Sequence, residues 1–215
     1  EEGIDFRAHI RDDGRFDFIW QGEQIEMPAP SLQGVHQVQN ASLALAAMKM
    51  ATPDAFTPAA FNGISQAKWP GRIQELQTGK LKNVLGSGHP LWLDGAHNAH
   101  GAAALVTTLK SLSQQKWIVI FGALNTRPPE ALFTQIKPVA STVYTLEISG
   151  QPAALSAQEL AAAAMSANIP AEPATCLAEA LARIKQTALP NTPVIICGSL
   201  YLAGQVLEEN QTLPD

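Results

Sequence analysis

The chain has 215 residues, of which 46% are hydrophobic and 15% are charged, as expected for a globular protein with a sizeable core. Its formal net charge of −5 gives no indication of binding to nucleic acid or to an anionic membrane surface. No apolar run is long enough to span a bilayer, and the acidic amino terminus does not resemble a signal peptide. We therefore expect a cytoplasmic protein.

The termini and cysteines add two expectations. The chain lacks an initiating Met and begins almost at once with a predicted strand, which indicates a piece of a longer protein. Cys176 and Cys197 lie far apart in apolar surroundings and lack metal-ligand spacing. Both are therefore predicted to be buried thiols in a reducing compartment.

The first part of the chain is predicted to form an antiparallel β-sheet edge followed by two helices. Residues 4–28 alternate in polarity between turn signals, which is typical of short strands. The next stretch is rich in Ala, Leu and Met at helical spacing, and Pro58 suits the first turn of a second helix. The predicted strands are Ile4–Ile10, Arg15–Trp20 and Gln24–Met27, and the predicted helices are Val35–Ala51 and Pro58–Gln66.

The second part is predicted to be an α/β domain with a mostly parallel sheet and helices on both faces. Lys68-Trp69-Pro70-Gly71-Arg72 breaks regular structure, and the domain boundary is placed between residues 70 and 71. Residues 73–86 are expected to add one or two strands. From residue 90, continuously apolar strands alternate with helices. These strands are Leu91–Asp94, Trp117–Gly122, Thr142–Ile148 and Pro193–Gly198, and the helices are Ala99–Leu112, Pro129–Lys137, Ala157–Ala167, Leu177–Ala188 and Leu202–Glu209.

The sharpest candidate site is Leu93-Asp94-Gly95-Ala96-His97-Asn98, where an apolar strand gives way to a helix. Ligands of open parallel sheets bind beyond the carboxyl ends of strands, where the Asp94 carboxylate can accept hydrogen bonds from ribose hydroxyls. Gly95 allows a sharp turn, and Asn98 is placed to cap the helix. Position alone supports equally an alternative in which Asp94 and Asn98 serve the turn and the cap, and His97 packs in the loop.

A second candidate opens the long helix of the first part. His36 and Asn40 lie one turn apart, and an Asn amide can read the edge of an adenine because it both donates and accepts. On spacing alone, a polar helix start that faces water is the favoured alternative.

The third candidate is Arg72 in the sequence Trp-Pro-Gly-Arg at the domain boundary. Arg binds phosphate bidentately, and Lys68, Lys80 and Lys82 make this region basic within an acidic chain. The alternative is a solvated linker in which Arg72 caps or pairs.

The last motif, Cys197-Gly198-Ser199-Leu200-Tyr201, is predicted to be a strand-to-helix turn in which Ser199 serves as a cap and not as a nucleophile. The sequence contains no G-x-x-x-x-G-K-[ST] phosphate loop, no G-x-G-x-x-G fingerprint and no cluster with metal-ligand spacing.

The four motifs occur in an order that resembles the bifunctional dihydrofolate synthase/folylpolyglutamate synthase family of the Mur-ligase superfamily. The resemblance covers nearly the whole chain and implies the carboxyl-terminal half of such an enzyme. Residues 1–70 would be the truncated end of the central ATP-binding domain, as a small β-plus-helix remnant. Residues 71–215 would be the Rossmann-like Mur-ligase carboxyl-terminal domain. One departure is Ala99, where many relatives have Pro.

The resemblance also implies a reaction. The family uses ATP to join L-glutamate to dihydropteroate or to folates through an acyl phosphate, with magnesium as cofactor. Asn40, Arg72 and Asp94 match its nucleotide-contacting positions, and His97 is a neighbouring contributor and the one candidate for a catalytic role. The phosphate loop and magnesium ligands would lie in the missing amino-terminal half, so the chain alone is expected to be inactive. The glutamate-binding residues are not identified, and a monomer without nucleic-acid or membrane partners is expected.

Two other functions remain open on the sequence. One is a cell-wall Mur ligase that acts on a UDP-linked muramyl substrate, although the Cys-Gly-Ser-Leu-Tyr ending and the His-Gln helix start favour the folate branch. The other is a non-catalytic α/β domain that binds a nucleotide or a partner protein.

Overall fold

The computed structural model describes residues 2–212. The chain divides into two compact units, unit 1 (Glu1–Trp69) and unit 2 (Pro70–Asp215). Within the described residues, no helix has both the length and the apolar character needed to cross a membrane.

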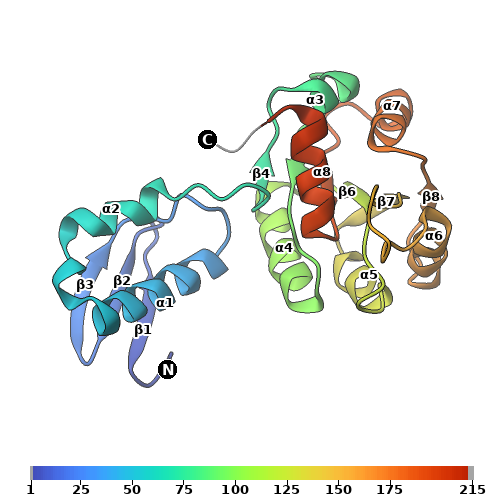
Figure 1. Ribbon diagram of the computed structural model, residues 1–215. Coiled ribbons are helices and arrows are strands. Elements are labelled where there is room, and N and C mark those ends of the chain that lie inside the picture. Colours follow the sequence, from blue (N-terminus) through green and yellow to red (C-terminus); the bar gives the residue numbers. More distant parts are fainter. Residues whose placement is uncertain (1, 213–215) are drawn as a thin grey trace. The chain divides into compact units, whose positions relative to one another are not determined.

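Unit 1 is a three-stranded antiparallel sheet covered by helices (Figure 1). Alternation places Phe16 and Phe18 of the central strand in its core, against one face of the long helix. Every predicted element is found, within two residues of its predicted ends. The elements are β1 (Phe6–Ile10), β2 (Phe16–Trp20), β3 (Glu23–Met27), α1 (His36–Ala51), a short 3-10 helix η1 (Pro53–Ala55) and α2 (Pro58–Gln66).

Unit 2 is an open six-stranded sheet with the order β4-β5-β9-β6-β7-β8, in which only β4 is antiparallel. The predicted fold class is confirmed. The strands are β4 (Gln74–Glu75), β5 (Leu91–Leu93), β6 (Trp117–Phe121), β7 (Ala140–Thr145), β8 (Ala171–Pro173) and β9 (Val194–Cys197). The helices are α3 (Lys80–Leu85), α4 (Ala99–Leu112), α5 (Glu130–Ile136), α6 (Ala157–Ser166), α7 (Leu177–Thr187) and α8 (Leu200–Asn210).

The central strands are buried on both faces because their side chains alternate between two hydrophobic clusters. Val119 and Phe121 of β6 pack with α4, α5 and α6, whereas Ile118 and Ile120 pack with α3, α7 and α8. This arrangement sends the chain after β5 to one face of the sheet, in α4, and the chain after the neighbouring β9 to the other face, in α8.

The prediction of one or two strands in residues 73–86 is only partly correct, because Gln74–Glu75 is a strand and Lys80–Leu85 is a helix. Polar–apolar alternation in Lys-Leu-Lys fits a strand, but Leu81 and Leu85 are spaced for one helical face and both are buried. Strand β8 was not predicted, because its sequence Ala-Glu-Pro carries no strand-forming residues. Strand β7 begins two residues and ends three residues before its predicted limits.

The cysteine prediction is correct for Cys197, which is buried, and wrong for Cys176, which is exposed. Cys176 occupies the N-cap position of α7, outside the apolar face of that helix. Burial raises the pKa of the Cys197 thiol.

Asn210 at the end of α8 holds the start of α3 in place through hydrogen bonds. It is fully buried, and its Oδ1 accepts hydrogen bonds from the backbone N–H groups of Leu81 at 2.9 Å and Lys82 at 3.1 Å. Its Nδ2 donates to the carbonyl of Thr78 at 2.9 Å. Because the first N–H groups of a helix have no partner within the helix, this side chain completes the start of α3.

We expect Asn210→Ala to destabilise unit 2 by about 2–4 kcal/mol, because it leaves buried N–H groups of α3 without a partner. Urea unfolding would measure the change. Asn125→Ala, at an exposed position of the same unit, is the matched control and should lie within about 0.5 kcal/mol of the parent. Equal stability of the two variants would contradict a fastening role for Asn210.

Candidate functional site

The candidate site is the edge of unit 2 where β5, β9 and β6 end. Backbone hydrogen bonds tie the three ends together: Asp94 N–H donates to Ile196 at 2.9 Å and Gly198 N–H to Ala96 at 3.0 Å, and Gly122 N–H, after β6, donates to Cys197 at 3.4 Å. The helices that follow β5 and β9 lie on opposite faces of the sheet. In open α/β sheets, this divergence of neighbouring connections creates the crevice in which ligands bind.

Two glycines allow the chain to pack closely at this edge. Gly198 has φ of +117°, and a Cβ there would lie 2.6 Å from the carbonyl oxygen of Gly122. A Cβ on Gly95 would lie 2.4 Å from Cδ2 of Leu200, at the start of α8. A side chain at Gly198 would therefore be strained by both conformation and contact.

Asp94 is built into the fold at the end of β5. Only 5% of the residue is exposed. Its Oδ1 accepts from the N–H of Ala96 at 2.7 Å, and its Oδ2 accepts from the N–H of Ile73 at 3.0 Å. Burial raises the pKa of the carboxyl group, and these two hydrogen bonds and the charge of Arg72 partly oppose that rise.

The segment that bears Arg72 is fixed on both sides. Gly95 N–H donates to the carbonyl of Gly71 at 2.7 Å, and Gly71 N–H donates to Oε1 of Gln74 at 3.0 Å. On the other side, Ile73 is 3% exposed and has φ of +46°. Arg72 is half-buried between these two anchored residues.

His97 and Asn98 occupy the loop between β5 and α4. His97 is exposed, and its Nδ1 lies 3.0 Å from the carbonyl oxygen of Gly95. Asn98 is the N-cap of α4, as predicted, because its Oδ1 accepts from Gly101 N–H at 2.8 Å. Ser199 caps α8 in the same way, also as predicted, through Tyr201 N–H at 3.1 Å.

Asn40 belongs to unit 1, in the second turn of α1. Its Nδ2 donates to Oε1 of the buried Gln37 at 3.0 Å, and Nε2 of Gln37 lies 2.9 Å from Nε2 of His36. Gln37 thus bridges the two residues that the sequence placed on one face. The structure brings Arg72, Asp94 and His97 together within unit 2. The ligand roles of these three residues and of Asn40 remain predictions.

Sequence reasoning missed the contributions of Gly71, Ile73 and Gln74 to this edge. Pro70-Gly71 signals a turn, but a β-branched residue is rarely left-handed, so nothing in the sequence indicates the conformation of Ile73. The partner of its N–H, Asp94, lies 21 residues further on.

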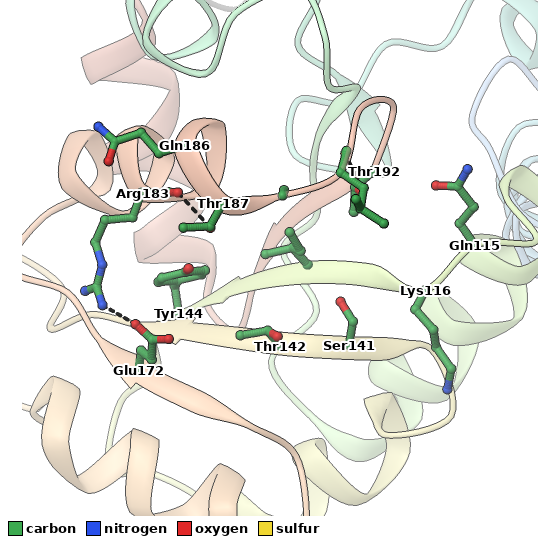
Figure 2. A pocket seen from close by; sticks show the side chains of 13 residues that line it. Gln115, Lys116, Ser141, Thr142, Tyr144, Glu172, Arg183, Gln186, Thr187 and Thr192 are labelled. Atoms are coloured by element: carbon green, nitrogen blue, oxygen red, sulfur yellow. Dashed lines mark hydrogen bonds and ion pairs between the residues drawn. The ribbon is translucent and has the colours of Figure 1, made fainter.

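A hollow of about 830 Å³ lies near the amino ends of β6 and β7 (Figure 2). Its charged side chains already have partners in the protein. Arg183 pairs with Glu172, and Nζ of Lys116 donates to the carbonyl of Pro138 at 2.6 Å. The carboxyl edge is therefore the better candidate, because it also has the topology of a ligand crevice.

The fold defines an open, doubly wound α/β domain, and the carboxyl edge of its sheet is the place where domains of this kind bind ligands. Residues 81–200 match the model of the Mur ligase glutamate ligase domain. The chain therefore belongs to the Mur ligase family, and the predicted resemblance is confirmed.

The curated relatives of this chain include folylpolyglutamate and dihydrofolate synthases. The chain is 30% identical to the folylpolyglutamate synthase of Lacticaseibacillus casei, over 89% of this chain and 42% of that protein. It is 26% identical to the dihydrofolate synthase/folylpolyglutamate synthase of Bacillus subtilis, over 89% of this chain and 43% of that protein. The chain thus spans less than half the length of these relatives.

Solved structures support the same fold. E. coli FolC in complex with DHPP and ADP superposes with a TM-score of 0.79 at 22% identity, over 96% of this chain and 46% of that chain. The folylpolyglutamate synthase of Thermotoga maritima gives a TM-score of 0.72 at 25% identity, over 98% and 48% of the two chains.

We expect the stability of unit 2 to depend on pH through Asp94. Because burial raises the folded-state pKa above the ordinary value of 3.8, protonation of Asp94 favours the folded state. This contribution is complete below pH 3.8 and is lost as pH rises through the folded pKa. The unfolding free energy of the parent minus that of Asp94→Asn should therefore fall as pH is raised from about 4 to about 7.

Urea unfolding of both proteins across this range provides the measurement. Asp54→Asn, at an exposed position of unit 1, controls for the loss of one negative charge. A parent-minus-variant difference that rises with pH would show that the folded-state pKa of Asp94 is lowered instead.

Proposed function

We propose that this chain is the carboxyl-terminal part of an ATP-dependent ligase that joins L-glutamate to dihydropteroate or to folates. Unit 1 corresponds in this proposal to the end of the central ATP-binding domain, and unit 2 to the Rossmann-like ligase domain. The observation that carries the proposal is the match to a glutamate ligase domain in the same unit whose carboxyl edge gathers Arg72, Asp94 and His97.

The residues of that edge suit a nucleotide. The Arg72 guanidinium stays charged and presents a planar set of donors that fits phosphate oxygens, so it can offset charge on a transferring phosphoryl group. We propose that Asp94 accepts hydrogen bonds from the ribose of the nucleotide and that His97 lies next to it. Asn40 of unit 1 is proposed separately as an adenine-binding residue. One solved relative is described with Mn, AMPPNP and L-glutamate bound.

Magnesium and ATP are the cofactors of this proposal. Among residues 2–212, no group of three or more His, Cys, Asp or Glu side chains could hold a metal ion. None of these residues is therefore assigned to magnesium. ATP supplies the activated phosphoryl group, and the part of Arg72 is to bind and orient it.

The proposed substrates are small molecules, namely dihydropteroate or a folate, L-glutamate and ATP. A cytoplasmic monomer without nucleic-acid or membrane partners remains part of the proposal. The UDP-muramyl alternative has less support, because the two relatives described above are named as folylpolyglutamate or dihydrofolate synthases. The membership of unit 2 in a ligase family weakens the non-catalytic alternative.

We expect calorimetric titration with ATP and magnesium to detect binding by this chain, and Arg72→Gln to weaken it by about tenfold or more, because a charge-assisted hydrogen bond is lost. Arg183→Gln is the matched control, since Arg183 is engaged by Glu172 away from the carboxyl edge. Equal affinities of the parent and Arg72→Gln would remove Arg72 from the proposed site.

We also expect the chain alone to release ADP only at the background rate when it is given ATP, magnesium, L-glutamate and dihydropteroate. Formation of an acyl phosphate requires a cradle for the β- and γ-phosphates, and the sequence contains no such loop. A coupled ADP assay is the measurement. Release above background that disappears in Arg72→Gln would show that these 215 residues form a complete catalyst.

A further inference from the structure

The outward face of α1 in unit 1 carries a line of exposed apolar side chains. Leu43 is 62% exposed and Met50 is 75% exposed, and the exposed Ala47 lies between them. Steps of four and three residues place the three on one side of the second half of the helix. These residues are named the α1 outer stripe. The opposite side of α1 is also apolar, because Val38 and Leu45 pack into the core of unit 1.

A helix with apolar side chains on two opposite sides is typical of the interior of a protein and not of its surface. Single exposed apolar residues are common and need no explanation, whereas a continuous apolar patch marks an interaction site. Two further exposed alanines, Ala44 and Ala51, flank the α1 outer stripe. Because their side chains are small, another surface can approach the helix closely along this side.

The other surfaces of unit 1 suit water. On the sheet face opposite the core, Asp17 and Glu26 are cross-strand partners, and both form ion pairs with Arg11. The exposed positions of α2 include the polar residues Asn62 and Gln66. Polar and paired charged groups of this kind lose hydration when they are covered. The α1 outer stripe is therefore the surface of unit 1 that gains most from being buried.

The relatives indicate what covers this surface. Over 89% of its own length, the chain matches 42% of the Lacticaseibacillus casei protein. The superposition with E. coli FolC covers 96% of this chain and 46% of that chain. More than half of each relative thus lies outside the matched region, which is enough chain to form a domain with an apolar surface of its own.

We propose that the α1 outer stripe docks onto the rest of the central ATP-binding domain, in a longer protein of which this chain is one part. The identity of this occupant rests on the proposed function, which assigns unit 1 to the end of that domain. Docking removes the side chains of Leu43 and Met50 from water and so stabilises the assembled domain. Asn40 lies one turn before Leu43 on the same side of α1, so the docked surface ends next to the proposed adenine-binding residue.

The first test compares the reactivity of Met50 in two proteins, the 215-residue chain and the product of the complete gene. Hydrogen peroxide converts exposed Met to its sulfoxide, and mass spectrometry reads the rate at each site. Met50 should react at least about tenfold more slowly in the longer protein, because docking excludes the reagent from its side chain.

Met165 is the matched reference for this test, because it is 55% exposed on α6 of unit 2. Its rate should be the same in both proteins. Equal rates of oxidation at Met50 in the two proteins would overturn the proposal. A complete gene that encodes no further domain would overturn it as well, because the occupant would not exist.

The second test replaces the apolar surface. The double variant Leu43→Gln with Met50→Gln keeps helix-forming residues in α1. It should change the melting temperature of the 215-residue chain by less than about 1 °C, since both side chains are exposed there. In the longer protein it should lower the melting temperature by about 3 °C or more, because buried apolar area is lost.

Met165→Gln is the control for this comparison and should have the same small effect in both proteins. If the double variant shifts the melting temperature equally in the two proteins, the α1 outer stripe is not a docking surface.

The outcomes separate this proposal from the proposed function, because ligase activity of the longer protein is measured independently as release of ADP. If Met50 is protected but the longer protein shows no ligase activity, the docking surface stands and the proposed function loses its support. If the longer protein is an active ligase but Met50 reacts as fast as in the 215-residue chain, the proposed function stands and the docking surface fails.

Discussion

A single buried carboxylate organises the carboxyl edge of unit 2. Asp94 sits where β5 ends, and it accepts backbone N–H groups from two segments that are distant in sequence, at Ile73 and at Ala96. Burial disfavours its charge, which its raised pKa reflects, and the two hydrogen bonds recover part of that cost. Because each of its two oxygens accepts a hydrogen bond from a different segment, this buried side chain links the Gly71–Ile73 segment to the loop after β5.

The position of this carboxylate follows from the topology. Strands β5 and β9 are parallel neighbours, but the helices after them cover opposite faces of the sheet. The two connections therefore separate directly above the strand ends, and Asp94 lies at the point of separation. The hydrophobic clusters on both faces fix the sheet, so the separation of the two connections is a consequence of how the core is built.

The sequence predicted those features that are encoded locally. The limits of α4 were predicted to the residue because Asn98 caps it and an Ala- and Leu-rich stretch follows. Local signals failed where a residue distant in sequence determines the structure. The polar–apolar alternation of residues 80–82 fits a strand, but this segment starts helix α3, whose first N–H groups are bound by Asn210. The left-handed Ile73 is of the same kind, because its N–H is held by Asp94.

The hydrogen bonds made by the glycines of this edge limit how unit 2 can bind phosphate. A phosphate cradle needs backbone N–H groups that point at the ligand. Here those of Gly95 and Gly198 donate to the carbonyls of Gly71 and Ala96. One N–H in the first turn of each following helix is also engaged, because Asn98 caps α4 through Gly101 and Ser199 caps α8 through Tyr201. With these donors committed to the fold, the guanidinium of Arg72 is the group of this edge that best suits phosphate. The positive charge of Arg72 then has value only if it is held in one place, which the hydrogen bonds around Gly71 and Ile73 provide.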